Sequence, residues 1–171
     1  MAKKKQHKQQ PQLDPFAYIR TKARTLPIYK CYINSNWKEK GLASIIVARQ
    51  HTTGNFTTGM YIVDTFCKGL VQTYTKFNGD EDILKFNLEL HIPPEGDFIT
   101  LMEIDYTLAH NIIYGAISFA EENGYKPHKD FETFKYILEE DDEDIELIEI
   151  DFGVDGKPFL IERDYEDAYK E

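Results

Sequence analysis

The chain has 171 residues, of which 42% are hydrophobic and 13% aromatic, and it carries a formal net charge of −10. This length suits one domain plus a terminal arm, and the apolar content can form a buried core, which excludes a chain that is disordered throughout. No apolar run approaches the roughly 20 residues that span a bilayer, and no apolar segment follows the N-terminal lysines as in a secretory signal. Two cysteines are too few for a disulfide framework, so we expect a reduced, cytoplasmic protein.

The charge is divided between the two ends of the chain. Residues 1–50 hold 11 Lys or Arg against 2 acidic residues, whereas residues 79–171 hold 7 Lys or Arg against 27 acidic residues. This division is typical of a basic arm that reaches an anionic partner and an acidic body that repels one.

Three regions are predicted along the chain. Residues 1–17 are rich in Lys, Gln and Pro and are predicted to be a disordered basic arm. Residues 18–162 are predicted to form a single α+β domain, and residues 163–171 a charged C-terminal tail.

The first half of the domain is predicted to be β-structure. Residues 44–49 and 60–66 are rich in β-branched side chains, and the segment between them contains Gly54 and Asn55, which predicts an antiparallel hairpin. Residues 28–33 and 70–77 are expected to add further strands. Residues 83–91 alternate between apolar and polar, which favours a strand, although the acidic residues 80–82 before them suit the first turn of a helix.

The second half of the domain is predicted to contain two consecutive helices and a final hairpin. An apolar stripe at helical spacing predicts a helix over about 103–123, and a second helix is predicted over about 129–140. Residues 145–152 and 157–161 are predicted to pair around Asp155 and Gly156. The resulting fold class is α+β, with an antiparallel sheet built from hairpins packed against the two consecutive helices.

The long helix carries an unusual polar face. No Lys, Arg, Asp or Glu occurs from Tyr106 to Ala120, so this face is expected to be half buried rather than solvated. One interpretation is a cleft wall in which His110 is an acid or base, with Tyr114 one turn away. The other, more common, outcome is a hydrogen-bonded network in the core.

Asp64 is the third candidate catalytic residue. It lies in an otherwise apolar strand, and a buried carboxylate with a raised pKa would mark a functional site. The alternative is that Asp64 caps the end of the strand or pairs with Arg49 or a lysine. The spacing of His, Asp and Glu residues fits no metal-binding motif, so neither a metal nor a cofactor is expected.

The basic residues of the first part of the chain are candidates for binding nucleic acid. Cationic side chains release counterions from phosphates, and the interleaved Tyr18 and Tyr29 could stack on single-stranded bases. The alternative is a solubilising tail. The candidate nucleic-acid-binding residues are Lys3, Lys4, Lys5, Lys8, Arg20, Lys22 and Arg24.

Two stretches, residues 54–69 and 108–116, resemble a group of bacterial proteins that are classed as domains of unknown function. The resemblance covers roughly residues 18–162 and implies a bacterial cytoplasmic protein with one domain. It implies no activity, cofactor or catalytic residue.

These features lead to competing hypotheses of function. The first is a binding module whose basic arm contacts nucleic acid or a ribonucleoprotein and whose acidic body contacts a protein. The alternative is a small hydrolase or nuclease that uses His110 with a nearby carboxylate, which leaves open whether the protein is an enzyme. A third hypothesis is that the acidic region mimics a nucleic acid and occupies a basic protein surface.

Overall fold

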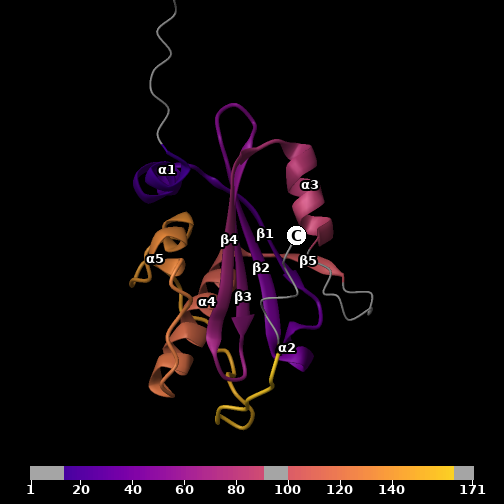
Figure 1. Ribbon diagram of the computed structural model, residues 1–171, viewed down its shortest axis with the longest axis vertical. Coiled ribbons are helices and arrows are strands. Elements are labelled where there is room, and N and C mark those ends of the chain that lie inside the picture. Colours follow the sequence, from indigo (N-terminus) through magenta and orange to yellow (C-terminus); the bar gives the residue numbers. More distant parts are fainter. Residues whose placement is uncertain (1–13, 91–99, 164–171) are drawn as a thin grey trace, which may run out of the picture.

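A five-stranded antiparallel sheet forms the centre of the computed structural model, which describes residues 14–90 and 100–163 (Figure 1). The strand order is β4-β3-β2-β1-β5. The strands are β1 (Ile28–Asn34), β2 (Leu42–Gln50), β3 (Phe56–Asp64), β4 (Gly69–Gly79) and β5 (Leu101–Ile104). The predicted α+β class is confirmed, as is the central hairpin, in which Ile45 of β2 lies opposite Tyr61 of β3.

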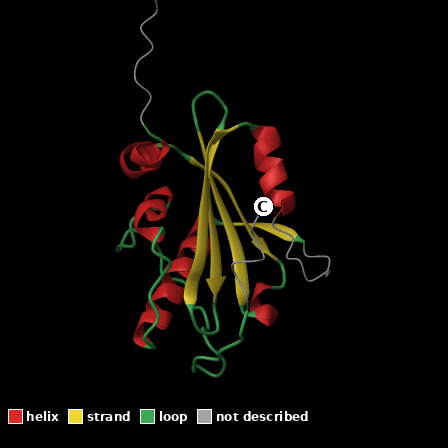
Figure 2. Ribbon diagram, in the orientation of Figure 1, coloured by secondary structure: helices red, strands yellow, loops and turns green. Residues whose placement is uncertain are grey.

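The central strands β2 and β3 are buried on both faces, which explains their density of β-branched and aromatic side chains. Their inward side chains on one face, among them Ile45 and Tyr61, belong to a core that also contains Ile112 and Ile113. The helices on this face are α1 (Pro15–Lys22), η1 (Ala23–Thr25), α4 (Tyr106–Glu122), α5 (Phe131–Phe134) and η2 (Lys135–Ile137) (Figure 2). The short helix α2 (Trp37–Lys40) connects β1 to β2.

Helix α3 (Glu81–Leu90) covers the other face of the sheet, so the preference for a strand over residues 83–91 is wrong within the described residues. The cause is a helix start that outweighs the alternating pattern. Asp80 accepts the N–H of Ile83 on its side chain at 2.9 Å and the N–H of Leu84 on its carbonyl at 3.0 Å. Leu84 then packs with Ala48 and Phe56 beneath the helix.

The C-terminal half differs more from the predictions. The second predicted helix, 129–140, is only the single turn of α5 followed by η2. The long helix begins at Tyr106 rather than at about residue 103, because residues 101–104 form β5. The predicted hairpin of 145–152 with 157–161 is wrong. Only the isolated bridge between Val154 and Lys157 forms there, around Asp155 and Gly156 with φ of 53° and 74°.

The predicted arm also needs a correction at its end. Residues 15–17 begin helix α1 instead of continuing a disordered segment, because Pro15 has a backbone angle suited to the first turn. Ile19 and Ala23 that follow are fully buried. Residues 1–13 lie outside the described residues, as does most of the predicted tail. Among the described helices, none has the length and apolar character needed to cross a membrane.

Candidate functional site

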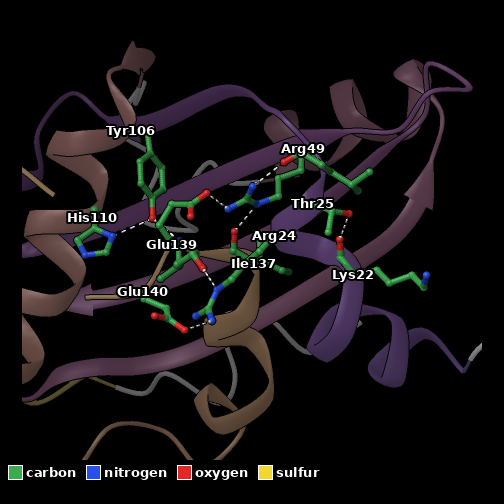
Figure 3. Close-up of polar contacts among 11 residues, drawn as sticks. Lys22, Arg24, Thr25, Arg49, Tyr106, His110, Ile137, Glu139 and Glu140 are labelled. Atoms are coloured by element: carbon green, nitrogen blue, oxygen red, sulfur yellow. Dashed lines mark hydrogen bonds and ion pairs between the residues drawn. The ribbon is translucent and has the colours of Figure 1, made fainter. Parts of the chain in front are cut away.

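The most distinctive polar feature is a set of contacts by which buried side chains hold the end of η2 and the irregular segment after it, residues 138–148, against the sheet and α4. Arg49 at the end of β2 is 1% exposed. Its guanidinium donates to the carbonyls of Ile137 and Leu26, both at 2.6 Å, and pairs with Glu139 at 2.8 Å (Figure 3). The Glu139 carboxylate neutralises a cation that would otherwise be costly to bury, and the two carbonyls satisfy its other N–H groups.

Arg24 of η1 makes a parallel set of contacts on the next residues. It donates to the carbonyl of Leu138 at 2.8 Å and to the carboxylate of Glu140 at 3.2 Å (Figure 3). Its guanidinium also lies 4.8 Å from the ring centroid of Tyr136. Arg24 was a candidate for binding nucleic acid, but here it pairs within the protein.

Side chains on the polar face of α4 also bond the segment that follows η2. The hydroxyl oxygen of Tyr106 accepts the N–H of Glu139 at 2.7 Å and lies 2.8 Å from Nδ1 of His110 (Figure 3). The hydroxyl can donate its own proton to Nδ1 when the imidazole carries its proton on Nε2. That nitrogen faces Asp141 at 3.2 Å. Both ring nitrogens of the buried His110 are thus engaged.

Asn111 completes what we call the polar clamp, which consists of Arg24, Arg49, Tyr106, His110 and Asn111. Its amide nitrogen donates to the carbonyl of Glu146 at 2.9 Å, and its amide oxygen accepts the N–H of Ile148 at 2.9 Å. The uncharged face of α4 therefore contacts backbone, which accounts for its lack of Lys, Arg, Asp and Glu.

The Tyr106 hydroxyl is expected to contribute substantially to stability. Tyr106→Phe leaves the N–H of Glu139 and Nδ1 of His110 without their partner, which should lower the free energy of unfolding by about 1–3 kcal/mol in urea titrations. Tyr114→Phe on the same helix is the matched control. No described residue bonds its hydroxyl, so a change within about 0.5 kcal/mol is expected. Equal effects of the two variants would contradict the clamp.

A cavity of about 750 Å³ lies beside the clamp and is lined by His110, Tyr114 and Asp141 among others. The His110 and Tyr114 rings lie 4.6 Å apart, so two of the predicted catalytic residues do come together. Burial raises the pKa of Tyr114 to about 12, so its phenol is a hydrogen-bond donor at neutral pH rather than a base. Among the residues that the structure describes, no group of three His, Cys, Asp or Glu could hold a metal ion.

Asp64 lies away from this cavity. Its carboxylate accepts the backbone N–H groups of Phe66, Cys67 and Lys68 at 3.0–3.2 Å, so it caps the turn after β3. Gly69, its partner across the turn, abuts Ala120 of α4. Ala120 is ten residues beyond His110, or about 15 Å along the helix axis, so Asp64 is not positioned to act with His110.

The exposed cations of α1 lie beside Tyr18, which the sequence indicated, and beside two aromatic rings that it did not. Tyr18, His51 and Phe77 have centroids 5.0–5.9 Å apart. With Lys22 they line a cavity of about 330 Å³. Arg20 is also exposed on this helix, whereas the predicted Lys3, Lys4, Lys5 and Lys8 lie outside the described residues.

His51 and Phe77 were missed in the sequence because they are far apart in the chain: His51 follows β2, and Phe77 lies near the end of β4. The pairing of β3 with both β2 and β4 brings those ends together, and the packing of α1 then adds Tyr18. Burial lowers the pKa of His51, whose Nε2 lies 2.7 Å from the Thr57 hydroxyl, so its ring is neutral at pH 7.

Comparison with known proteins adds no family to this description: no protein-family model matches the chain, and neither does any curated protein or solved structure.

Proposed function

We propose that the protein is a non-enzymatic binding module that contacts single-stranded nucleic acid, or a ribonucleoprotein containing it, at its α1 end. The acidic segment that follows η2, between Glu139 and Gly153, is the contact for a protein partner. In line with the bacterial resemblance, we place the module in the cytoplasm. There Cys31 and Cys67, which are free and buried, would remain reduced.

The observation that carries the proposal is the aromatic cavity lined by Tyr18, His51 and Phe77 beside exposed cations. Stacking of bases on aromatic side chains contributes about 1–3 kcal/mol per base and tolerates any sequence. Lys22 lines the same cavity, and Arg20 lies two residues before it on α1. Cations next to a stacking surface can bind the phosphates that link stacked bases.

The acidic segment runs away from this cavity, which supports two separate contacts. His51 follows β2 at one end of the sheet, and Asp64 ends β3 at the other, a strand length of about 30 Å. The N–H of Gly153 donates to the carbonyl of Thr65 near that far end. The chain from Glu139, which is bound to Arg49, to Gly153 therefore extends from the clamp towards the end of the sheet that is remote from the cavity (Figure 1).

Tyr18→Leu tests the stacking site. Loss of one stacked base should weaken binding of a labelled single-stranded oligonucleotide by about 1–3 kcal/mol, measured by fluorescence anisotropy at constant salt. Tyr29→Leu is the control, because Tyr29 is an exposed aromatic residue that packs on Phe56 outside the cavity. Equal losses for the two variants, or no binding by the wild-type chain at low salt, would refute the proposal.

A hydrolase or nuclease is the second candidate, favoured by the contact of His110 with Asp141 at the wall of the larger cavity. It requires Asp141 to release Nε2 to a substrate, since the other ring nitrogen is bonded to Tyr106. Turnover of a chromogenic phosphodiester or ester by the wild-type chain, lost in Asp141→Asn, would favour this candidate over the binding module.

A further inference from the structure

The segment held by Asn111 has the hydrogen-bonding pattern of a strand. One residue of a parallel strand bonds the carbonyl and the N–H of residues two positions apart on its neighbour. The Asn111 amide bonds Glu146 and Ile148 in this way. It therefore takes the place of a strand residue and holds the chain extended around Leu147.

Within the described part of the chain, the opposite side of this segment is an open edge. In an extended chain, successive residues direct their backbone groups to alternate sides, so Leu147 and Glu149 direct theirs away from Asn111. No described residue bonds the backbone of either one. Leu147 as a whole residue is 90% exposed. We call residues 145–149 the acidic edge.

The charge around the acidic edge defines what can bind it. No Lys or Arg occurs between Lys135 and Lys157. Glu139, Glu140 and Asp141 are paired with Arg49, Arg24 and His110. The remaining carboxylates of this stretch make no ion pair with a described residue: Asp142, Glu143, Asp144, Glu146, Glu149, Asp151 and Asp155. They repel a nucleic acid and attract a basic polypeptide.

We propose that the acidic edge binds an extended, lysine- or arginine-rich segment of a protein partner, which adds as a β-strand beside Leu147. This inference rests on the protein-contact half of the proposed function. Backbone bonds from the edge supply affinity, the exposed Leu147 packs on an apolar partner side chain, and the carboxylates select a basic sequence. The polar clamp already holds the edge in place, so little ordering is needed on binding.

The test titrates the full chain with a synthetic peptide of alternating Lys and Val and with the same peptide N-methylated at alternate amides. Both carry the same charge, but the methylated peptide cannot complete the strand bonds. We expect it to bind about tenfold more weakly, the equivalent of one lost backbone hydrogen bond. Hydrogen exchange at the amides of Leu147 and Glu149 should slow only with the unmodified peptide.

Leu147→Pro removes the N–H at the centre of the edge, and Leu147→Ala keeps it. The proline variant should also lose about tenfold in affinity for the unmodified peptide, while the alanine variant loses less. Because the Leu147 N–H has no described partner, circular dichroism should show an unchanged fold. Equal binding of both peptides to the wild-type chain would overturn strand addition in favour of charge attraction alone.

Two further outcomes separate this inference from the rest of the proposed function. Binding of the alternating peptide by a chain that binds no oligonucleotide would support strand addition and refute the nucleic-acid half alone. Self-association of the wild-type chain that Leu147→Pro abolishes would overturn the proposed partner, because the occupant of the edge would then be a second copy.

Discussion

Arg49→Met should lower the free energy of unfolding by about 3–5 kcal/mol, the cost typical of breaking a buried charge network. Arg49 is almost fully buried and joins three parts of the chain through Leu26, Ile137 and Glu139. Methionine fills part of the volume but donates no hydrogen bond. The two carbonyls then lose their donor in the interior, and the Glu139 carboxylate loses its counter-charge.

Lys30→Met is the control for the Arg49 experiment. Lys30 forms an exposed pair with Glu103 at 3.8 Å, so its loss should change stability by about 0–1 kcal/mol. Urea unfolding followed by circular dichroism measures both variants. If Arg49→Met lowers the free energy of unfolding by less than Lys30→Met does, other contacts hold the segment after η2. That result would contradict the polar clamp.

Neutralising the four N-terminal lysines should remove most of the salt dependence of oligonucleotide binding. Changing Lys3, Lys4, Lys5 and Lys8 together to Gln removes up to four phosphate contacts. The slope of log K against log salt should therefore fall by about 3 for a single strand. The loss of affinity between 50 and 200 mM salt should accordingly shrink by about 50-fold.

The matched control replaces four exposed lysines elsewhere, Lys38, Lys126, Lys129 and Lys157, by Gln. It changes the net charge equally, so it separates a local arm contact from a general effect of charge. An identical salt slope in both variants would mean that the arm makes no specific contribution. The lysine substitutions are preferable to a deletion of residues 1–25, which would remove Ile19 and Ala23 from the core.

The sheet could be predicted because its strands combine β-branched runs with a Gly-Asn turn, and both signals are local. Helix α3 could not be predicted with the same rules, since its alternating apolar residues favoured a strand. In the structure Asp80 accepts the N–H groups of Ile83 and Leu84 at the start of a helix. The sequence contained both the alternating pattern that favours a strand and the acidic residues that favour a helix start, and the helix formed.

The prediction of a final hairpin, residues 145–152 with 157–161, was wrong for a different reason. Residues 145–152 have the composition of a strand, but Asn111 of α4 bonds the segment where a neighbouring strand would lie. No pattern within residues 145–161 reveals that competitor, because it comes from more than thirty positions earlier.

The candidate sites were predicted in part. The uncharged face of α4 correctly indicated a buried polar network, and His110 and Tyr114 do lie together. The carboxylate beside His110 is Asp141, not Asp64. An apolar strand with one carboxylate did not distinguish a reactive group from the turn cap that Asp64 forms with three backbone N–H groups.

The most direct test of the binding-module account is an NMR titration of the full chain with a single-stranded oligonucleotide, following backbone amide shifts. The account predicts that the largest changes fall on Tyr18, His51 and Phe77, with the acidic edge unaffected. Changes centred on His110 and Asp141, or none anywhere at low salt, would contradict it.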